Sequence, residues 1–378
     1  MDEKMDDGLK IQHMNAPPSP DSLHVGHHEY KQSNSSAGTT IPYPDGQIHD
    51  ADVKGSPVPY AEHGVLIDRT RTGLKKKPLN SGLRWPRIRR IFREPFSEFM
   101  GTFILIMFGD GVVAQVVLSN GTKGDYQSIS WGWGIGVMLG VYASGISGAH
   151  INPAVTFANC LYRKFPWRKF PIYMLAQVLG AMCAAAVVYG NYKSAIDTFE
   201  GGAGIRTVPG YSPNASAGIF CTYPAAFMSN TGQFFSEFIA STLLMFCIYA
   251  LKDDGNIGAG NLTPLGLFFI IFGIGACFGW ETGYAINLAR DFGPRLVSYM
   301  IGYGPDVWRA GNYYFWVPMV APFFGCAFGG FLYDLLLFTG ESPINTPYLG
   351  LYRFIPGMRH MYDGVSFNPE DVKEDDPV

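Results

Sequence analysis

The chain has 378 residues, of which 47% are hydrophobic, 15% aromatic and only 16% charged. Soluble domains average about 25% charged residues, so this deficit indicates a membrane protein, and no segment resembles a nucleic-acid-binding module. The net charge of -3 is unevenly distributed, because residues 1–93 and 340–378 carry most of the charges.

We expect residues 1–93 to form a disordered cytoplasmic tail, because this segment is rich in Pro, Gly, Ser, His and charge and cannot bury a core. Basic residues gather at 69–77 and 84–93, directly before the first apolar run, and such a flank is typical of the cytoplasmic side. The alternative is a basic tail that binds nucleic acid or anionic lipid, and lipid binding is compatible with the first interpretation. The charged N-terminus lacks an apolar core, so no cleaved secretory signal is expected.

Six apolar runs follow, each close to the ~20 residues that span a membrane as a helix. They cover about 96–118, 129–147, 170–190, 232–251, 262–280 and 313–338. Four basic residues lie at 163–169, whereas the loops at 119–128 and 191–231 carry only three. The positive-inside rule therefore predicts both termini in the cytoplasm, with a C-terminal tail over 341–378.

Two patterns recur in the apolar region. FSEF at 96–99 returns at 235–238, and GAHINPA at 148–154 is answered by GYAINLA at 283–289. The region therefore contains two related halves of three spans each, and an odd number of spans turns the second half upside down in the membrane. The predicted membrane domain covers 94–340, with halves at about 94–190 and 232–338.

Asn152 and Asn287 each precede a helical pattern too short to span, at 153–162 and 288–301. Asn is a strong helix N-cap, and Pro153 occupies the first helical position, where its missing N–H costs nothing. Two such inverted half-helices would meet near the midplane with their positive dipole ends converging. Irregular backbone at that depth is tolerated where it is buried in protein or lines a water-filled cavity.

This arrangement favours passage of neutral, hydrogen-bonding solutes. The Asn152 and Asn287 amides would donate to a passing hydroxyl or water oxygen, and the dipole ends would repel cations, which is an established explanation of channel selectivity. A proton- or ion-coupled transporter is the alternative from another class, but such carriers place ionisable groups where these caps are neutral. No nucleophile, metal or nucleotide motif supports an enzyme.

SGAHINPAVT at 147–156 and GYAINLARDFGPRL at 283–296 resemble the two signature loops of the aquaporin, or major intrinsic protein, family. The resemblance covers about 94–340 and implies an all-α fold of six transmembrane helices plus two half-membrane helices, assembled as a homotetramer. Asp291 and the segment KDDGN at 252–256 are similar to the glycerol-facilitator branch, and the long N-terminal tail suggests a fungal member. The pore motif residues are Asn152, Pro153, Ala154, Asn287, Leu288 and Ala289.

Leu288 departs from the family pattern, which has Pro at this position. Leu is a good helix former and leaves the Asn cap in place, so we expect a working pore with altered fine selectivity. Matching by motif places the narrow constriction of the family at Trp133, Gly275, Tyr284 and Arg290. The alternative is that the two aromatics are interfacial belt residues and that Gly275 is a packing glycine.

The resemblance predicts a passive channel for glycerol and water, with urea or hydrogen peroxide as further solutes and a water-selective channel as the alternative. We expect Gly275 to leave room for a polyol and Arg290 to line the external vestibule. The expected supporting residues, with no part in proton coupling, are Glu98, Glu237, His150, Gln177 and Asp291. No metal or cofactor is predicted. The expected location is the plasma membrane, with sequons at Asn120 and Asn214 on the external side.

Overall fold

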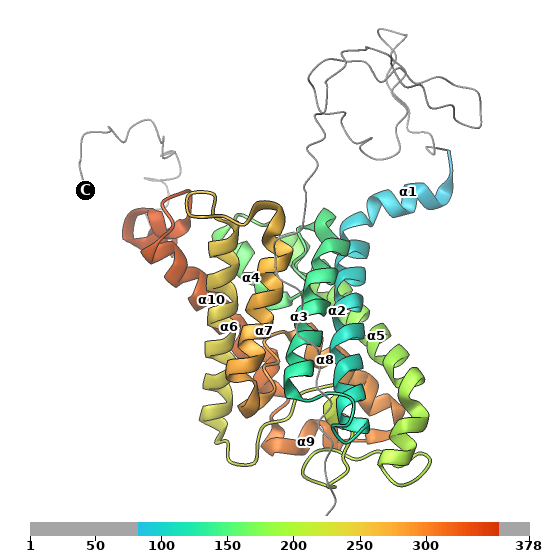
Figure 1. Ribbon diagram of the computed structural model, residues 1–378. Helices are drawn as coiled ribbons and strands as arrows, with labels where there is room; N and C mark the ends of the chain where they lie inside the picture. Colours follow the sequence, from blue (N-terminus) through green and yellow to red (C-terminus); the bar gives the residue numbers. More distant parts are fainter. Residues whose placement is uncertain (1–81, 355–378) are drawn as a thin grey trace, which may run out of the picture. The chain divides into compact units, whose positions relative to one another are not determined.

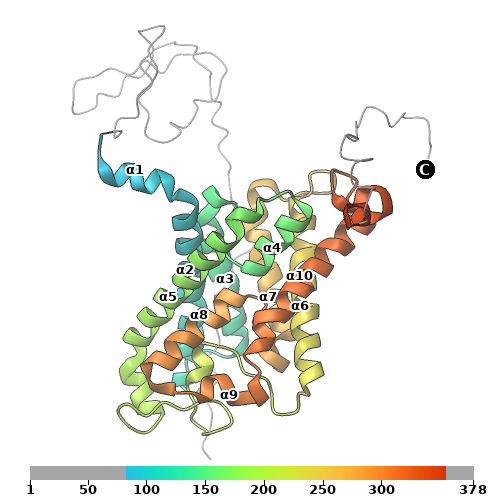
Figure 2. The same cartoon turned by 180° about the vertical axis from the view of Figure 1, so that it is seen from behind.

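The structure is a computed structural model that describes residues 82–354 (Figure 1). Two opposite views show long helices packed side by side, and no strand occurs within 82–354 (Figure 2). The expectations for residues 1–81 and 355–378, which make up most of the two predicted tails, lie outside the described residues.

Six helices in the described part are long and apolar enough to cross a membrane, which confirms the predicted number of spans. They are α2 (Arg93–Leu118), α3 (Tyr126–Ser144), α5 (Phe170–Phe199), α6 (Asn230–Lys252), α7 (Thr263–Thr282) and α10 (Trp316–Leu336). Helix α5 continues beyond its predicted end at 190, because the polar residues that follow the apolar run are compatible with helix.

The spanning helices pack in two similar sets. Helix α2 lies against α3 and α5, α6 lies against α7 and α10, and α3 meets α7 between the halves. Close approach depends on glycine at equivalent contacts. A Cβ on Gly180 would lie 2.3 Å from the Phe99 carbonyl oxygen, and one on Gly325 would lie 2.4 Å from the Phe238 carbonyl oxygen. The inverted repeat predicted from the sequence is thus visible in the packing.

Two short helices, α4 (Pro153–Tyr162) and α8 (Leu288–Ser298), begin at the predicted half-helix positions. Each packs on the last spanning helix of the opposite half, α4 on α10 and α8 on α5 (Figures 1 and 2). Helix α8 ends before the predicted residue 301, because the chain widens into a π-helical turn, η5 (Tyr299–Tyr303), in which Gly302 has a φ of 112°.

Part of the segment predicted to be disordered is helical. Residues Arg84–Ile91 form α1, directly before α2, because apolar and basic residues alternate there with helical spacing. Beyond residue 340, Ser342 caps a short turn through the Ile344 N–H. The remaining short elements are η1 (Gly145–Ser147), η2 (Trp167–Lys169), η3 (Ala217–Ile219), η4 (Gly260–Leu262), α9 (Asp306–Tyr313), η6 (Pro343–Asn345) and η7 (Pro347–Phe354).

Candidate functional site

The two half-helices begin with the same cap. Asn152 has φ, ψ of -154°, 122° and accepts from the Ala154 N–H at 2.9 Å. Asn287 has φ, ψ of -155°, 113° and accepts from the Ala289 N–H, also at 2.9 Å. Leu288 therefore takes the place of a proline without changing the geometry of the cap, because an N-cap is defined by these angles and this bond.

The caps are also linked to each other across the repeat. The Asn152 Nδ2 group donates to the Ile286 carbonyl at 2.8 Å, and the Asn287 Nδ2 group donates to the Ile151 carbonyl at 2.9 Å. An amide nitrogen carries two N–H donors, and this bond occupies one of them. Because both caps line a cavity, each has a second donor to offer to a solute.

The loops that lead into the half-helices have strained backbones at equivalent positions. Ala149 and Tyr284 have φ of 51° and 36°, and Ile151 and Ile286 have φ of 43° and 42°. Left-handed conformations are uncommon for residues with a Cβ and persist where the surroundings hold them. All four residues line the cavity, so the strain coincides with the cavity wall.

Glu98 holds the first of these loops. Its carboxylate is fully buried and accepts from the Ser147 hydroxyl at 2.5 Å and from the N–H groups of His150 at 2.9 Å and Ile151 at 2.7 Å. The Gln177 side chain adds a fourth bond at 2.7 Å. Four hydrogen bonds thus converge on one buried side chain, so these contacts can maintain the strained loop.

Glu237 holds the second loop in the same way. It accepts from the Thr282 hydroxyl at 2.7 Å and from the N–H groups of Ala285 at 2.9 Å and Ile286 at 2.8 Å. These three partners are the repeat equivalents of Ser147, His150 and Ile151, whereas the Gln177 bond to Glu98 has no counterpart in the described part of the chain and Tyr314 adds a weaker bond to Glu237 at 3.3 Å. Both glutamates lie behind the loops and do not contribute to the cavity wall.

The cavity has a volume of about 670 Å³, including its solvent-open part. Nineteen residues line it: Leu105, Trp133, Val137, Val141, Ala149, His150, Ile151, Asn152, Val155, Leu244, Ile248, Lys252, Leu267, Ile271, Tyr284, Ala285, Ile286, Asn287 and Arg290. Apart from the loop residues and three charged or aromatic side chains, the wall is aliphatic, so a solute meets few polar partners along it.

Three of the four residues predicted to form the constriction lie on this wall. The Arg290 guanidinium carbon is 4.1 Å from the centroid of the Trp133 ring, and the Arg290 Nη1 group donates to the Phe220 carbonyl at 3.3 Å. Tyr284 follows Gly283 in the second loop and lies on the same cavity. Two aromatic rings and one cation from the predicted set thus lie on the wall of one cavity.

Gly275, the fourth predicted residue, lies behind the Tyr284 ring. A Cβ there would be 2.8 Å from both Cζ and Oη of Tyr284, and a Cβ on Gly279 would be 2.7 Å from its Cδ1. These two glycines form a notch in α7 that receives the ring. Gly275 is not among the residues that line the cavity, and a side chain there would collide with the Tyr284 ring that does.

His150 and Lys252 also line the cavity. The His150 ring is fixed by Thr156, 3.1 Å from Nδ1, and by Asn159, 3.2 Å from Nε2. Lys252, at the end of α6, has an exposed side chain. Sequence analysis named Lys252 only as part of the KDDGN segment and did not predict it as a pore residue. A lysine in the last turn of a spanning helix was the feature of the sequence that could have indicated this position.

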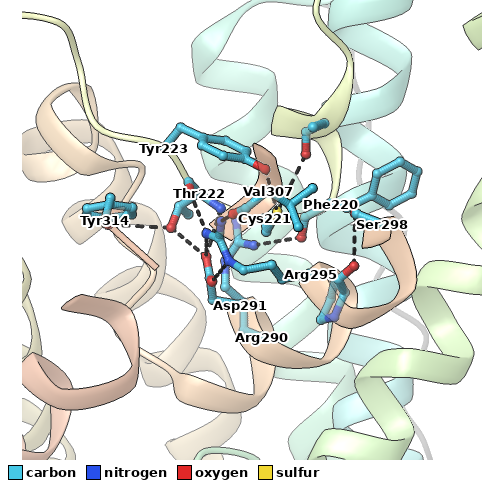
Figure 3. Close-up of polar contacts among 12 residues, drawn as sticks. Phe220, Cys221, Thr222, Tyr223, Arg290, Asp291, Arg295, Ser298, Val307 and Tyr314 are labelled. Carbon is cyan, nitrogen blue, oxygen red and sulfur yellow. Dashed lines mark hydrogen bonds and ion pairs between the residues drawn. The ribbon is translucent and has the colours of Figure 1, made fainter. Parts of the chain in front are cut away.

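A buried ion pair supports the base of α8 (Figure 3). Asp291 bonds Arg295 at 2.7 Å and accepts from the N–H and hydroxyl of Thr222 at 2.8 and 2.6 Å. Arg295 in turn donates to the Thr222 carbonyl at 2.7 Å and the Val307 carbonyl at 2.6 Å. These bonds hold the loop at 217–229 against α8, next to Arg290, which itself bonds the Phe220 carbonyl. Burial raises the pKa of the nearby Cys221 thiol to about 11, so this thiol stays neutral.

Asp110 is a further residue that sequence reasoning missed. It lies within α2, is fully buried, and neither carboxylate oxygen has a hydrogen-bond partner within 82–354. Arg290 and Asp291 are the charged groups that act on it electrostatically. An acidic residue in the first apolar run was the signal available in the sequence, because charges inside spans are costly.

A comparison with family models matches residues 87–333 to the major intrinsic proteins. The chain belongs to this family. Aquaglyceroporin-9 of Botryotinia fuckeliana is 74% identical over 82% of this chain and 68% of that protein. Probable aquaglyceroporin-2 of Gibberella zeae is 75% identical over 74% of this chain and 83% of that protein. The predicted glycerol-facilitator branch and its fungal affinity are thus confirmed.

A solved structure agrees with the fold of this major intrinsic protein. The X-ray structure of the aquaglyceroporin from Plasmodium falciparum is 34% identical in sequence, with a TM-score of 0.57, over 65% of this chain and 96% of that one. The aquaporin-like fold and the integral, multi-pass membrane character predicted from the sequence are therefore confirmed.

Proposed function

We propose that this protein is a passive channel for glycerol and water, with the cavity between its two halves as the pore. The observation that carries the proposal is the symmetric pair of caps, Asn152 and Asn287, which both line the cavity and each retain one N–H donor. A hydroxyl oxygen that passes the centre finds two neutral donors there. Neither cap can take up or release a proton, so coupling to an ion gradient has no chemical basis at this point.

The proposed selectivity filter is formed by Trp133, Tyr284 and Arg290, with Gly275 behind it. Glycerol has a carbon side and a hydroxyl side. The two aromatic rings offer apolar surface to the carbons, and the Arg290 guanidinium offers donors in a fixed fork to the hydroxyls. Gly275 supports this role because it allows the Tyr284 ring to withdraw into the α7 notch.

Ion exclusion follows from the same elements. Helices α4 and α8 point their N-termini at the centre of the pore, and each contributes a partial positive charge of about half a unit. Arg290 adds a full positive charge at the filter. Cations, including hydronium, meet a repulsive field there, and anions meet an aliphatic wall that does not replace their hydration.

We further propose a homotetramer in the plasma membrane with both termini in the cytoplasm. The two ends of the described chain, at α1 and after α10, lie at the same end of the helices (Figure 1). Basic residues at 84–93 and 163–169 belong to this end, which supports a cytoplasmic assignment by the positive-inside rule.

Stopped-flow measurements on proteoliposomes, with separate glycerol and water gradients, test the proposal. The flux of each solute should be faster than in empty liposomes and should follow the gradient of that solute. It should not depend on the membrane potential and should carry no current. Uphill accumulation of glycerol on a proton gradient would contradict the passive mechanism. Rapid water flux without glycerol flux would identify the water-selective alternative, and urea and hydrogen peroxide can be added in the same assay.

A further inference from the structure

Helix α1 lies outside the packed helices. It covers Arg84–Ile91, has no buried residue, and leads within two residues into α2. Figures 1 and 2 show it turning away from α2 at the end of the molecule where the span begins. It therefore extends sideways at the level of the membrane surface, where neither the pore nor the helix packing requires it.

The helix has two faces of different character. Trp85, Ile88 and Phe92 are spaced by three and four residues, so they share one side, and their exposed fractions are 60%, 42% and 49%. Arg87 and Arg90 point to the opposite side. An exposed apolar stripe opposite arginines is the pattern of a helix that lies in a membrane interface.

The apolar face continues into the surface of the span. The Trp85 and Phe92 ring centroids each lie 6.1 Å from that of Phe96, which is at the end of the first turn of α2 and 40% exposed. Phe96 belongs to the predicted first apolar run, at the edge of the hydrocarbon layer. Trp85 is thus held at the depth where tryptophan is enriched in membrane proteins.

The charge of the segment is of one sign. Residues 84–93 contain five arginines and no acidic residue. The next acidic residue, Glu94, is bonded to Lys169 at 2.7 and 2.9 Å. Guanidinium groups bind phosphate through two parallel hydrogen bonds, and arginines beside an anionic leaflet favour it by about 1 kcal/mol each. The partner that fits both faces at once is an anionic phospholipid. Its phosphate can bind the arginine face while its acyl chains contact the apolar face.

We propose that α1 is an interfacial helix that binds anionic phospholipid headgroups with Arg87 and Arg90 while Trp85, Ile88 and Phe92 enter the acyl boundary. The inference rests on the membrane function proposed above. It gives the channel a lipid-recognition site separate from its pore, at the junction with the N-terminal segment.

The test uses the full-length protein in nanodiscs of phosphatidylcholine that contain an equal, small fraction of brominated phosphatidylserine or brominated phosphatidylcholine. Bromine quenches nearby tryptophan, and the Trp85 contribution is the difference between the wild type and Trp85→Phe, since the chain has seven tryptophans. We expect the serine lipid to quench the Trp85 signal at least about fivefold more effectively, the equivalent of one cation near the surface.

Two variants identify the cause. Replacing Arg87 and Arg90 together by Gln should reduce the preference to about one, whereas replacing both by Lys should retain most of it, because lysine keeps the charge that attracts an anionic leaflet. Equal quenching by both lipids in the wild type would overturn the proposal, and so would a Trp85 signal that neither lipid quenches. A preference that survives in the Gln variant would assign the site to other residues and also overturn it.

Glycerol flux, measured in parallel on proteoliposomes of the same variants, separates this inference from the proposed function. Both leaflets of the nanodisc contain the anionic lipid, so the lipid measurement does not depend on which end of the channel is cytoplasmic. Intact flux without a lipid preference would refute only the α1 site. Absent flux with a clear preference would refute only the channel.

Discussion

A methyl group at position 275 tests whether the Tyr284 ring controls the width of the filter. In Gly275→Ala the new Cβ would lie 2.8 Å from Cζ and Oη of Tyr284 and 3.1 Å from the Ser130 hydroxyl. Such distances are shorter than ordinary carbon contacts of about 3.5–4.0 Å, so the ring must move. The notch in α7 is closed behind it by the new methyl, and the free direction is toward the cavity that Tyr284 already lines.

The expected size of the effect follows from the cost of overpacking, which is typically about 1–3 kcal/mol. If that energy must be supplied when a polyol passes the displaced ring, glycerol flux falls about 5- to 150-fold, because each 1.36 kcal/mol is a factor of ten in rate. Water is narrower than a carbon backbone with hydroxyls and should be slowed much less. The glycerol-to-water ratio is therefore the informative quantity.

The assay is stopped-flow light scattering on proteoliposomes with matched amounts of folded protein, checked by size-exclusion chromatography. Gly273→Ala is the matched control, because it lies in the same helix and a Cβ there meets nothing within 4 Å. Its glycerol and water fluxes should equal those of the wild type.

A second substitution distinguishes the ring from the helix. Adding Tyr284→Ala to Gly275→Ala removes the displaced group and should restore glycerol flux. A folded Gly275→Ala channel with the wild-type ratio of glycerol to water would refute this reasoning and remove Gly275 from the filter. Loss of flux that Tyr284→Ala does not restore would place the damage in helix packing instead.

Three further predictions concern the contacts of the site. Leu288→Pro should change the unfolding free energy by less than about 1 kcal/mol, because Asn287 already has the cap angles of its repeat equivalent, and thermal denaturation in detergent measures it. Glu98→Gln and Glu237→Gln should each destabilise by about 1–3 kcal/mol and reduce flux to a similar extent, since each carboxylate serves one strained loop; unequal effects would contradict equivalent roles. Asp110→Val should stabilise the protein by about 1–3 kcal/mol, because it removes two buried oxygens without hydrogen-bond partners within 82–354. A lower midpoint of thermal unfolding would show instead that the Asp110 carboxylate has a hydrogen-bond partner in the membrane.

The architecture could be predicted because its causes are local and repeated. Apolar runs of bilayer length predict the spans, and the recurrence of FSEF and of the Asn motif predicts two inverted halves. Asn152 and Asn287 could also be predicted from local sequence, because a strong N-cap before a helix too short to span is typical of a half-membrane helix. The position of Trp133 followed from the family motif and was not determined by hydropathy.

Other parts of the site depend on contacts between distant segments. Gly275 was expected on the pore wall, but whether it faces the cavity or a neighbouring ring is decided by Tyr284, and no local pattern encodes that contact. Thr222 joins Asp291 and Arg295 from a loop with no hydropathy signal. Helix α1 was concealed by its composition, because a window dominated by arginine resembles a disordered tail even when its few apolar residues have helical spacing.

The reciprocal bonds at the centre of the pore also impose an order on biosynthesis. The carbonyl that accepts from Asn152 belongs to Ile286, 134 residues further along the chain. During synthesis from the N-terminus, the Asn152 side-chain amide therefore lacks this acceptor until the second half has been inserted. Neither half can complete its own centre, so the two bonds that join the caps can form only after Ile286 and Asn287 have been inserted.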